Sequence, residues 1–489
     1  MTGIRIEMDG LGQAELAADA LYGVNTLRAV QNFPLSGRPI ASAPHFIWAL
    51  ALVKQAAAQA NLELGAISSD RADAIVTACR DIGQGLYDEH FVVDMLEGSG
   101  GTSTNMNVNE VIANIVASKR GEGLGTYAFV HPNDHVNLGQ STNDVIPTAM
   151  KLAIYRALAD AEAGLEELAR AFLKKAQEYE GLLRLGRTCL QDAQPMTLGQ
   201  AFGGYAAVTQ RHREQLAILR QQFLHLPIGG TAIGTGFGSS PGYRDAVVRH
   251  IGALTGEAFT SIANPFDGMQ NMDTCARLSA ELRNAANSSW KIANDLIVLS
   301  SGPAGGLQEI TLAAVQQGSS IMPGKVNPVI PMAVCQVAFA ITGNDAAIAM
   351  ACQQGLLEIN HYELLVCDRL LDSITLLARS ADMFAGRCIN GLVANETTSL
   401  DHLMASSALA TALVPSLGYA AVSNIVRTSL AQGRSFVEVA VEQGVLKESD
   451  IVSILAKAAG GTARLTSLTC FPEKGPGISG FQLKVTSDA

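Results

Sequence analysis

Three short segments of the chain contain more small polar residues than a helical core needs. Residues 98–109 read GSGGTSTNMNVN, residues 137–144 read NLGQSTND, and residues 318–328 read GSSIMPGKVNP. Ser, Thr and Asn side chains that open a helix lie beside free backbone N–H groups at the positive end of the helix dipole, and this arrangement binds carboxylates. One such segment alone is typical of ordinary helix capping. Three of them, one with a lysine six residues after its first serine, favour an anionic substrate.

A glycine-rich stretch, GTGFG at residues 234–238, is the one candidate for a nucleotide-binding loop. It lacks the third glycine of a dinucleotide-binding turn, and no acidic residue follows a second strand. The stretch is therefore interpreted as a tight turn between helices.

Long segments with helical periodicity must position the polar segments. Several exceed twenty residues, whereas the average globular helix has about 11–12. Long helices with an apolar stripe, joined by loops that contain motifs, are typical of a bundle whose core extends across subunits. The sequence therefore predicts a mainly α fold. The segments lie roughly at 143–178, 195–223, 270–300, 328–352 and 364–390.

The pattern divides the chain into three predicted domains. Residues 1–140 alternate short helical stretches with turns, and form a mixed or helical N-terminal domain. Residues 141–395 form the central long-helix bundle. Residues 396–489 form a small C-terminal helical domain, with a turn-rich tail from Gly460.

The composition limits the function classes. Charged residues are only 16% of the 489 and hydrophobic residues are 48%, which indicates a surface largely covered by other subunits. The net charge is -11 without a run of Lys and Arg, so nucleic acid is not an expected partner. No uninterrupted apolar run approaches the ~20 residues of a membrane span, and no basic and apolar signal opens the chain. Eight scattered cysteines without a CxxC pair predict free thiols in a reducing cytoplasm.

The segment at 318–328, GSSIMPGKVNP, resembles the signature loop of the aspartase/fumarase superfamily. The other two polar segments resemble the remaining active-site regions of that family, in the same order and at similar spacing. A fourth segment, GRTCLQDAQPMTLG at 186–199, resembles its GRT–LQDA stretch. Three further segments are more similar to aspartases than to fumarases: YGVNTLRAVQNF at 22–33, GGTAIGTG at 229–236 and LQEITLAAVQ at 307–316. The resemblance covers roughly residues 1–455.

The resemblance implies a subunit of three domains with a long central helix bundle and a tetrameric multi-helix core. It implies a homotetramer in which each active site is assembled from three subunits. In the implied reaction, a base removes a proton from the carbon next to a carboxylate, and a leaving group is expelled to form a double bond. No organic cofactor and no metal site are implied, and a divalent ion would at most be an activator. His131 and His135 have metal-ligand spacing, but HPNDHVN resembles an ordinary non-metal segment of the family.

The resemblance also implies residue roles. Ser319 would be the catalytic general base, ionised when the loop closes over the substrate, with Gly318 and Gly324 allowing that movement. The resulting dianion needs concentrated hydrogen bonding and positive charge. The substrate-binding residues would be Thr102, Ser141, Thr142 and Ser320 for the carboxylate next to the acidic carbon, Lys325, Asn327 and Thr188 for the other carboxylate, and Asn143 for the amino group.

Two departures from the family pattern concern the leaving group. Cys189 stands where fumarases and many aspartases have His, and Met332 stands where the family commonly has Glu. Fumarases are thought to relay a proton through that pair. Hydroxide needs a proton donor to leave near neutral pH, whereas ammonium, a tertiary amine or nitrite does not. The double loss favours an amine-type leaving group, with Cys189 a space-filling thiol rather than a nucleophile or redox switch, and with Met332 a packing residue.

A third departure concerns substrate specificity. Residues 355–365 read GLLEINHYELL, where the family usually has an apolar residue after the asparagine and a proline soon afterwards. His361 is either an exposed capping residue or a side chain that recognises a substrate group other than a plain β-carboxylate. In the family this region lines the active site from a neighbouring subunit.

The sequence therefore predicts a cytoplasmic carbon–nitrogen lyase acting on a small carboxylate or amino acid, with L-aspartate to fumarate and ammonia the favoured reaction. An ergothionase-like trimethylamine lyase and a nitrosuccinate lyase are open alternatives. Fumarate hydratase is disfavoured by the missing relay. A non-catalytic structural homologue is disfavoured further, because a protein without catalytic activity has no physical need for Ser319 and Lys325 in the loop.

Overall fold

The computed structural model describes residues 3–460, 465–470 and 481–485. Helices dominate, and the predicted mainly α class is confirmed. The chain forms two compact units, while the predicted division into three domains at residues 140 and 395 stays a prediction. Unit 1 comprises residues 1–163, 213–285 and 339–378, and unit 2 comprises residues 164–212, 286–338 and 379–489.

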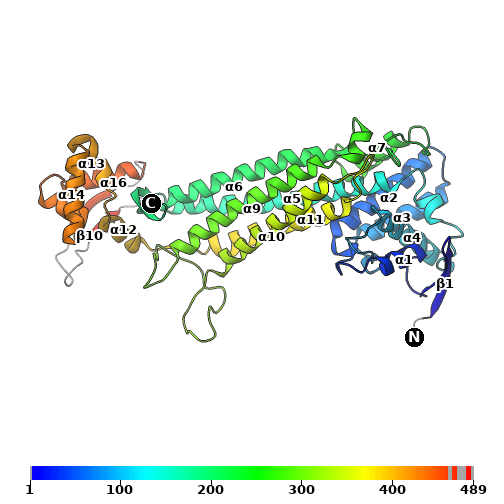
Figure 1. Cartoon of the computed structure of the whole chain (residues 1–489), viewed down its shortest axis with the longest axis horizontal. Helices are drawn as coiled ribbons and strands as arrows, with labels where there is room; N and C mark the ends of the chain where they lie inside the picture. The colour runs from blue at the N-terminus through cyan, green and yellow to red at the C-terminus, as the bar shows by residue number, and fades with distance from the viewer. Residues whose placement is uncertain (1–2, 461–464, 471–480, 486–489) are drawn as a thin grey trace. The chain divides into compact units, whose positions relative to one another are not determined.

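The chain contains five long helices, which are labelled in Figure 1. Each contributes residues to both units. They match the five predicted segments to within about six residues at each end, because an apolar stripe repeated every 3.6 residues is a strong local signal. The helices are α5 (Thr142–Glu178), α6 (Leu198–Gln221), α9 (Asp273–Leu299), α10 (Val329–Cys352) and α11 (Glu363–Phe384).

Side-chain contacts hold these helices together within each unit. In unit 1, Ser279 on α9 donates a hydrogen bond to Asp345 on α10 at 2.6 Å. In unit 2, the Phe172 ring of α5 packs against Phe202 of α6 and Phe384 of α11, with ring centroids 6.2 and 6.0 Å apart. The long helices are thus linked by a buried polar pair in unit 1 and by aromatic packing in unit 2.

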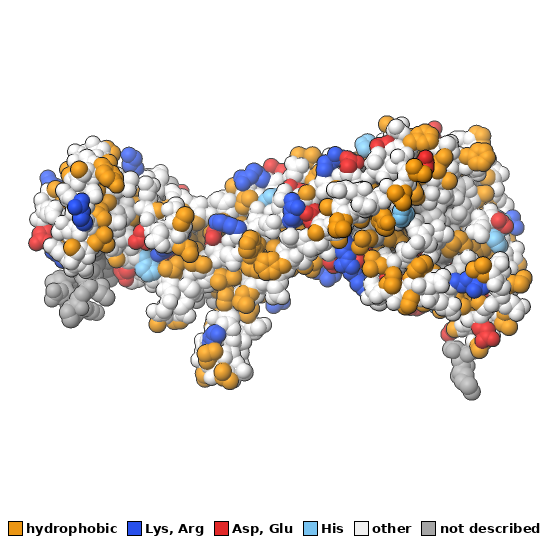
Figure 2. Space-filling view, in the orientation of Figure 1, with side chains coloured by type: hydrophobic (Ala, Val, Ile, Leu, Met, Phe, Trp, Pro, Cys, Tyr) orange, Lys and Arg blue, Asp and Glu red, His pale blue; other side chains and the backbone are white. Residues whose placement is uncertain are grey.

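Helix α10 leaves much of its apolar surface uncovered. It is the one helix in the described part of the chain that is long and apolar enough to cross a membrane, yet only 39% of its most apolar window is buried. Met332, Phe339 and Met350 are 49%, 59% and 70% exposed. Hydrophobic side chains lie open over this helix in the space-filling view (Figure 2).

The remaining elements of unit 1 range from two-residue strands to the 20-residue helix α2. Strands β1 and β2 pair in an antiparallel hairpin, and β5 and β6 form a short parallel pair. Residues 234–238 form bends and a turn between strand β5 and helix α7, where a tight turn between helices was predicted. The elements are β1 (Ile4–Asp9), β2 (Gly12–Ala17), α1 (Val24–Asn32), η1 (Ile40–Ser42), α2 (Pro44–Glu63), α3 (Ser69–Gly83), η2 (Asp88–His90), α4 (Thr102–Lys119), η3 (Pro132–Val136), η4 (Gln222–Leu224), β5 (His225–Leu226), α7 (Tyr243–Thr255), β6 (Thr260–Ser261) and α8 (Pro265–Gln270).

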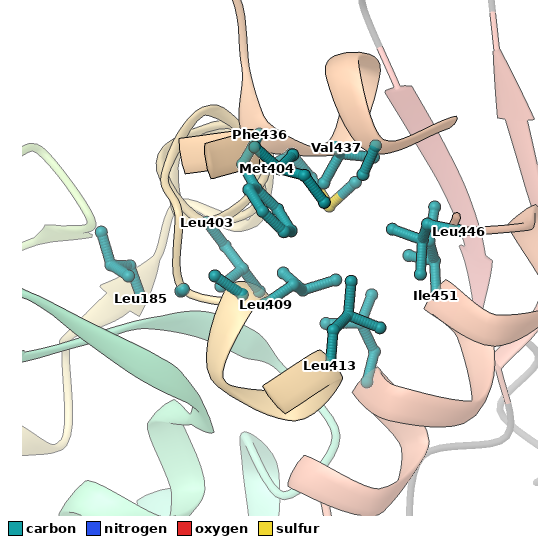
Figure 3. Packing of buried hydrophobic residues seen from close by; sticks show 14 of the residues in the cluster. Leu185, Leu403, Met404, Leu409, Leu413, Phe436, Val437, Leu446 and Ile451 are labelled. Atoms are coloured by element: carbon teal, nitrogen blue, oxygen red, sulfur yellow. The ribbon is translucent and has the colours of Figure 1, made fainter. Parts of the chain in front are cut away.

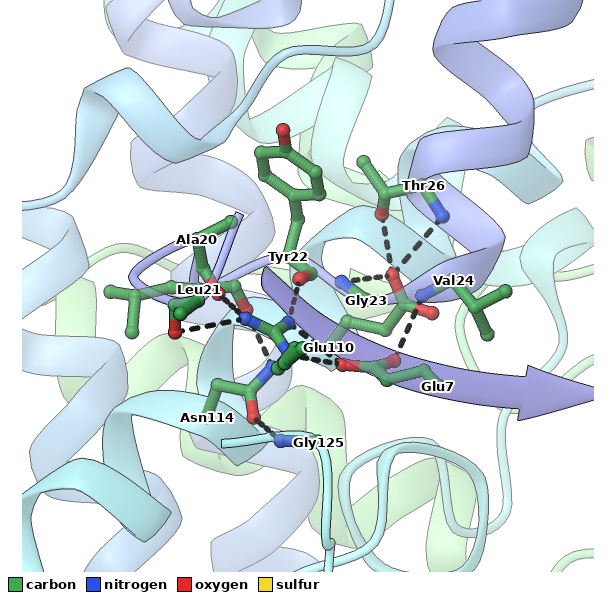
Figure 4. A network of polar contacts seen from close by, with 12 residues as sticks. Glu7, Ala20, Leu21, Tyr22, Gly23, Val24, Thr26, Glu110, Asn114 and Gly125 are labelled. Atoms are coloured by element: carbon green, nitrogen blue, oxygen red, sulfur yellow. Dashed lines mark hydrogen bonds and ion pairs between the residues drawn. The ribbon is translucent and has the colours of Figure 1, made fainter. Parts of the chain in front are cut away.

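A buried carboxylate on α4 fixes the N-terminal segment of unit 1 (Figure 4). Gly23 precedes α1 and offers no side chain to cap it. Glu110 supplies the cap from α4, since its carboxylate accepts the backbone N–H of Gly23 at 2.8 Å and of Thr26 at 3.1 Å. Glu7 of β1 accepts the Val24 N–H at 3.0 Å. Helix α4 and the N-terminal hairpin are therefore joined through the start of α1.

The C-terminal part of unit 2 has its own apolar core. Leu185 of β3 belongs to it together with Leu403, Leu409, Phe436 and other buried side chains (Figure 3). The elements outside the long helices are β3 (Leu183–Thr188), β4 (Gln191–Thr197), β7 (Ile310–Thr311), η5 (Ala385–Ile389), β8 (Val393–Ala394), α12 (Glu396–Ala405), α13 (Ala410–Leu417), α14 (Tyr419–Gln432), α15 (Phe436–Glu442), α16 (Glu448–Ala458), β9 (Leu465–Cys470) and β10 (Phe481–Val485).

The tail after Gly460 differs from the turn-rich prediction where the structure describes it. Residues 465–470 and 481–485 pair as antiparallel strands. Residues 461–464 and 471–480, which contain most of the glycines and prolines behind that prediction, lie outside the described residues. Both strands, LTSLTC and FQLKV, contain β-branched or aromatic residues, a signal that the turn residues between them outweighed.

Candidate active site

The first two polar segments meet in unit 1, where α4 and α5 begin. Thr102 is the first residue of α4 and Thr142 is the first residue of α5. The Asn105 amide of α4 donates to the Thr142 hydroxyl at 3.3 Å, which joins the two helix starts. Both helices thus present backbone N–H groups and hydroxyls in the same region, as carboxylate binding requires.

Asp144 holds the turn that contains Ser141 and Asn143. Its carboxylate accepts the Ser141 N–H at 3.0 Å, and the N–H groups of Gly229 and Thr231 at 2.9 and 2.8 Å. Burial raises the pKa of Asp144 to about 7 against the effect of these hydrogen bonds. The Asn143 side-chain amide donates to the carbonyl that follows Thr231 in the chain, at 2.8 Å. The GGTAIGTG segment therefore serves as a support for the start of α5.

The sequence analysis missed a buried lysine beneath this region. Lys54 of α2 is fully buried, and its ammonium donates to Asn137 and Gln140, both at 3.0 Å. The Asn137 oxygen also accepts from the Asn105 amide at 3.0 Å. Burial lowers the pKa of Lys54 to about 7. The signal was a single Lys inside the apolar run ALALVKQAAAQAN, which a helical core tolerates only when partners are present.

His361 lies against the first polar segment within the same chain. A Cβ atom at Gly100 would lie 3.3 Å from the His361 Cβ, so the two backbones are close. The His361 ring stacks on Tyr362 with centroids 4.2 Å apart. Because Gly100 is two residues before Thr102, His361 lies near Thr102 of its own chain.

The signature loop lies in unit 2 and closes on itself. The Gly318 N–H donates to the Lys325 carbonyl at 3.1 Å, and the Asn327 amide donates to the Gly318 carbonyl. A side chain at position 318 would collide with that Lys325 carbonyl, so only glycine fits. Ser319 is half-buried, and Ser320 and Lys325 are exposed. The loop therefore presents its polar groups outward rather than into a core.

Two backbone N–H groups point at the Ser319 hydroxyl. Ile321 and Met322 donate to its Oγ at 3.2 and 3.0 Å. Preorganised N–H donors of this kind stabilise an oxygen that becomes negative. The Ser319 oxygen thus accepts two backbone hydrogen bonds within its own loop.

Thr188 ends β3 and is exposed, as is the neighbouring Cys189, whose φ is 53°. Met332 is 49% exposed. Neither Cys189 nor Met332 is buried within its own chain, and the packing roles predicted for them stay predictions. The structure brings Thr102, Ser141, Thr142, Asn143 and His361 together in unit 1. In the described residues no hydrogen bond joins Thr188 to the loop at 318–328, although both lie in unit 2.

The two histidines with metal-ligand spacing are part of a local turn. The His135 Nδ1 accepts the His131 N–H at 2.8 Å, and the His131 Nδ1 accepts the Asp134 N–H at 3.2 Å. Across residues 3–460 and the two described tail strands, no group of three or more His, Cys, Asp and Glu side chains is placed to hold a metal ion.

Comparisons with known proteins agree with this geometry. A family model described as Lyase matches residues 12–343, and one described as Fumarase C C-terminus matches residues 409–458. The aspartate ammonia-lyase of Pseudomonas aeruginosa is 45% identical, over 92% of this chain and 95% of that protein. The class II fumarate hydratase of Halobacterium salinarum is 43% identical, over 92% and 96%.

A solved structure described as fumarate lyase:delta crystallin, from Brucella melitensis, has a TM-score of 0.90 to this chain at 42% identity, and the match covers 94% of this chain and 99% of that one. Sequence and fold therefore agree. The chain is a lyase of the aspartase/fumarase superfamily, and within it belongs with the aspartate ammonia-lyase-like members.

Proposed function

We propose that this protein converts L-aspartate to fumarate and ammonia, with Ser319 as the general base. The observation that supports this most directly is the pair of N–H groups donating to the Ser319 oxygen. The serinate takes a proton from the carbon next to the β-carboxylate, and the electron pair moves into that carboxylate. The pair then returns to form the carbon–carbon double bond as the carbon–nitrogen bond breaks and the amine leaves.

The two carboxylates of the substrate are assigned to different parts of the chain. The β-carboxylate, which becomes a dianion, is bound by hydroxyls at the starts of α4 and α5 and by Ser320, where N–H groups and helix dipoles stabilise negative charge. The α-carboxylate is bound by the Lys325 ammonium with Asn327 and Thr188. Asn143, held by its bond to the Ala232 carbonyl, orients the amino group.

The leaving group is assigned from Cys189 and Met332. Relatives named as aspartate ammonia-lyase and as fumarate hydratase match at nearly equal identity, so identity alone does not choose between ammonia and water. With cysteine and methionine at these positions, no imidazole and carboxylate stand there to protonate a departing hydroxide. An amine leaves as a stable species without such a donor. Trimethylamine and nitrite satisfy the same argument and are the second candidates, with His361 as the side chain to recognise a different substrate group.

We further propose that the protein is a cytoplasmic homotetramer whose site is completed by three subunits. The exposed apolar surface of α10 supports burial against other copies, because such a surface is rare on an isolated monomer.

The experiment is a substrate screen that follows the ultraviolet absorbance of the unsaturated acid product. L-aspartate, malate, argininosuccinate, ergothioneine and nitrosuccinate are compared with wild-type protein. Ser319→Ala should lower the rate on the active substrate by about 10²- to 10⁴-fold, the range for loss of a general base. Its unfolding midpoint should stay at the wild-type value, because Ser319 lies on a surface loop. Retained activity in Ser319→Ala would exclude Ser319 as the base, and hydration of fumarate at an enzymic rate would exclude the leaving-group assignment.

A further inference from the structure

The Glu309 carboxylate is a buried ionic centre that the proposed chemistry does not use. Its side chain is 1% exposed. One oxygen lies 2.9 Å from Arg184 Nε, and the other lies 2.6 Å from an Arg187 nitrogen and 3.0 Å from His402 Nδ1. Burial raises the pKa of Glu309, but Arg184, the hydrogen bond with His402 and Arg187 together hold it below its usual value. A buried ion centre of this kind specifies one arrangement, because loss of any partner leaves uncompensated charge.

The strand β3 is distorted so that both arginines reach this carboxylate. Arg184 and Arg187 are three residues apart, and in a regular strand their side chains would point to opposite faces. The pairing of β3 with β4 shifts register between Leu185 and Arg187, which re-aims the second arginine. Gly186 permits the irregularity, since a Cβ there would lie 2.8 Å from the Gln194 carbonyl oxygen. The next residue after Arg187 is Thr188, so the ion pair fixes the end of the strand that contains it.

The same glutamate fixes the start of the segment that leads to the signature loop. Its backbone N–H donates to the Leu299 carbonyl at the end of α9, at 2.9 Å, and its carbonyl accepts the Asn395 N–H at 2.8 Å. Strand β7 begins at the next residue and pairs with β8. Ser319 follows Glu309 by ten residues. Glu309 thus connects strand β3, which contains Thr188, to the segment at 309–317 that leads into the signature loop. This segment is called the root of the loop.

The third partner connects both parts to the C-terminal core. His402 lies on α12, and the next residue, Leu403, is buried in the apolar cluster that also contains Leu185 of β3 (Figure 3). Helix α12 and strand β3 are therefore joined by apolar packing beside the ionic centre.

We infer that Glu309 is a positioning residue, which holds Thr188 and the root of the loop at 318–328 in a fixed arrangement within unit 2. Glu309 touches no predicted substrate-binding side chain, so it acts through Arg187 and through its own backbone. The inference rests on the proposed function for the roles of Thr188 and Ser319.

The test compares Glu309→Gln with a matched control, Asp345→Asn. Asp345 is also a buried carboxylate, and among the described residues its polar partners are Ser279 and Arg283 of α9 rather than residues of the loop or of β3. Glu309→Gln should raise the KM for L-aspartate about 10-fold with a smaller change in kcat, as expected when a binding group is displaced. It should also speed tryptic cleavage after Lys325, which is exposed in the loop. Asp345→Asn should leave both quantities at the wild-type value even if its unfolding midpoint falls.

The inference is overturned if Glu309→Gln and Asp345→Asn give the same KM and the same rate of cleavage after Lys325. If Glu309→Gln does not fold, Arg187→Lys decides, because it keeps the charge but loses the fixed geometry of the guanidinium. That variant should show the same two changes to a smaller extent, and wild-type values would overturn the inference. A wild type that forms no fumarate from L-aspartate contradicts the proposed function, while the tryptic comparison still decides the role of Glu309.

Discussion

At the start of α5, buried ionisable side chains fix the positions of the polar groups for which substrate binding is proposed. Lys54 holds Asn137 and Gln140, and Asp144 holds the Ser141 N–H and the turn at residue 231. These backbone and amide groups are thus held in place before substrate arrives. Binding then costs less conformational entropy, which is the advantage of a preorganised site.

The Thr142 hydroxyl is the best single residue on which to test this surface. Thr142→Val keeps the shape and removes the hydroxyl, so the KM for L-aspartate should rise about 10- to 100-fold, the value of one hydrogen bond to a charged group. The matched control is Thr148→Val on the same helix, whose hydroxyl bonds the Asp144 carbonyl at 2.6 Å. Steady-state kinetics that show equal KM values for the two variants would remove Thr142 from the site.

At the scale of elements, the signature loop depends on one close approach. Gly318→Ala would drive a methyl group into the Lys325 carbonyl and open the ring that the loop forms. The resulting displacement of Ser319 should lower kcat/KM about 100-fold. Gly305→Ala is the control, because nothing lies within 4 Å of a Cβ at that position. An active Gly318→Ala enzyme would show that the closed loop is not needed for catalysis.

The free energy of unfolding should depend on pH through Glu309, which links β3, β7 and α12. The pKa of Glu309 is lowered in the fold from the ordinary 4.5, so its contribution to stability is complete above about pH 4.5 and is lost as the pH falls below that value. Between about pH 5 and pH 3, wild-type protein should therefore lose free energy of unfolding more steeply than Glu309→Gln. Denaturant titrations at several pH values measure both slopes, and parallel slopes would mean that the carboxylate is not stabilised by its arginines.

At the scale of the whole molecule, α10 should decide assembly. Phe339→Asp places a charge on an exposed apolar face, so it should reduce the proposed tetramer to smaller species and lower activity at least about 10-fold if the site is shared. Leu11→Asp, at an 82% exposed leucine in the turn between β1 and β2, serves as the control and should keep the wild-type mass. Light scattering combined with activity measures both effects. A wild type that is monomeric at micromolar concentration would contradict the shared site.

The sequence by itself determined the long helices, the turn at residues 234–238 and the polar segments at helix starts. These are local properties: an apolar stripe repeats within a few residues, and a cap lies next to the helix that it caps. The same local signals supported Thr102, Ser141, Thr142 and Ser319 as candidates. Their resemblance to a known family then predicted the lyase class, which the comparisons confirm.

Only the tertiary structure decided which buried ionisable side chains support the polar segments. Lys54 meets Asn137 from 83 residues away, and Glu309 meets Arg184 from 125 residues away. No local pattern encodes such pairs, because a buried charge is tolerated only where the folded chain supplies its partner. The exposure of Cys189 and Met332 has the same origin, since burial depends on what the rest of the fold places over a side chain.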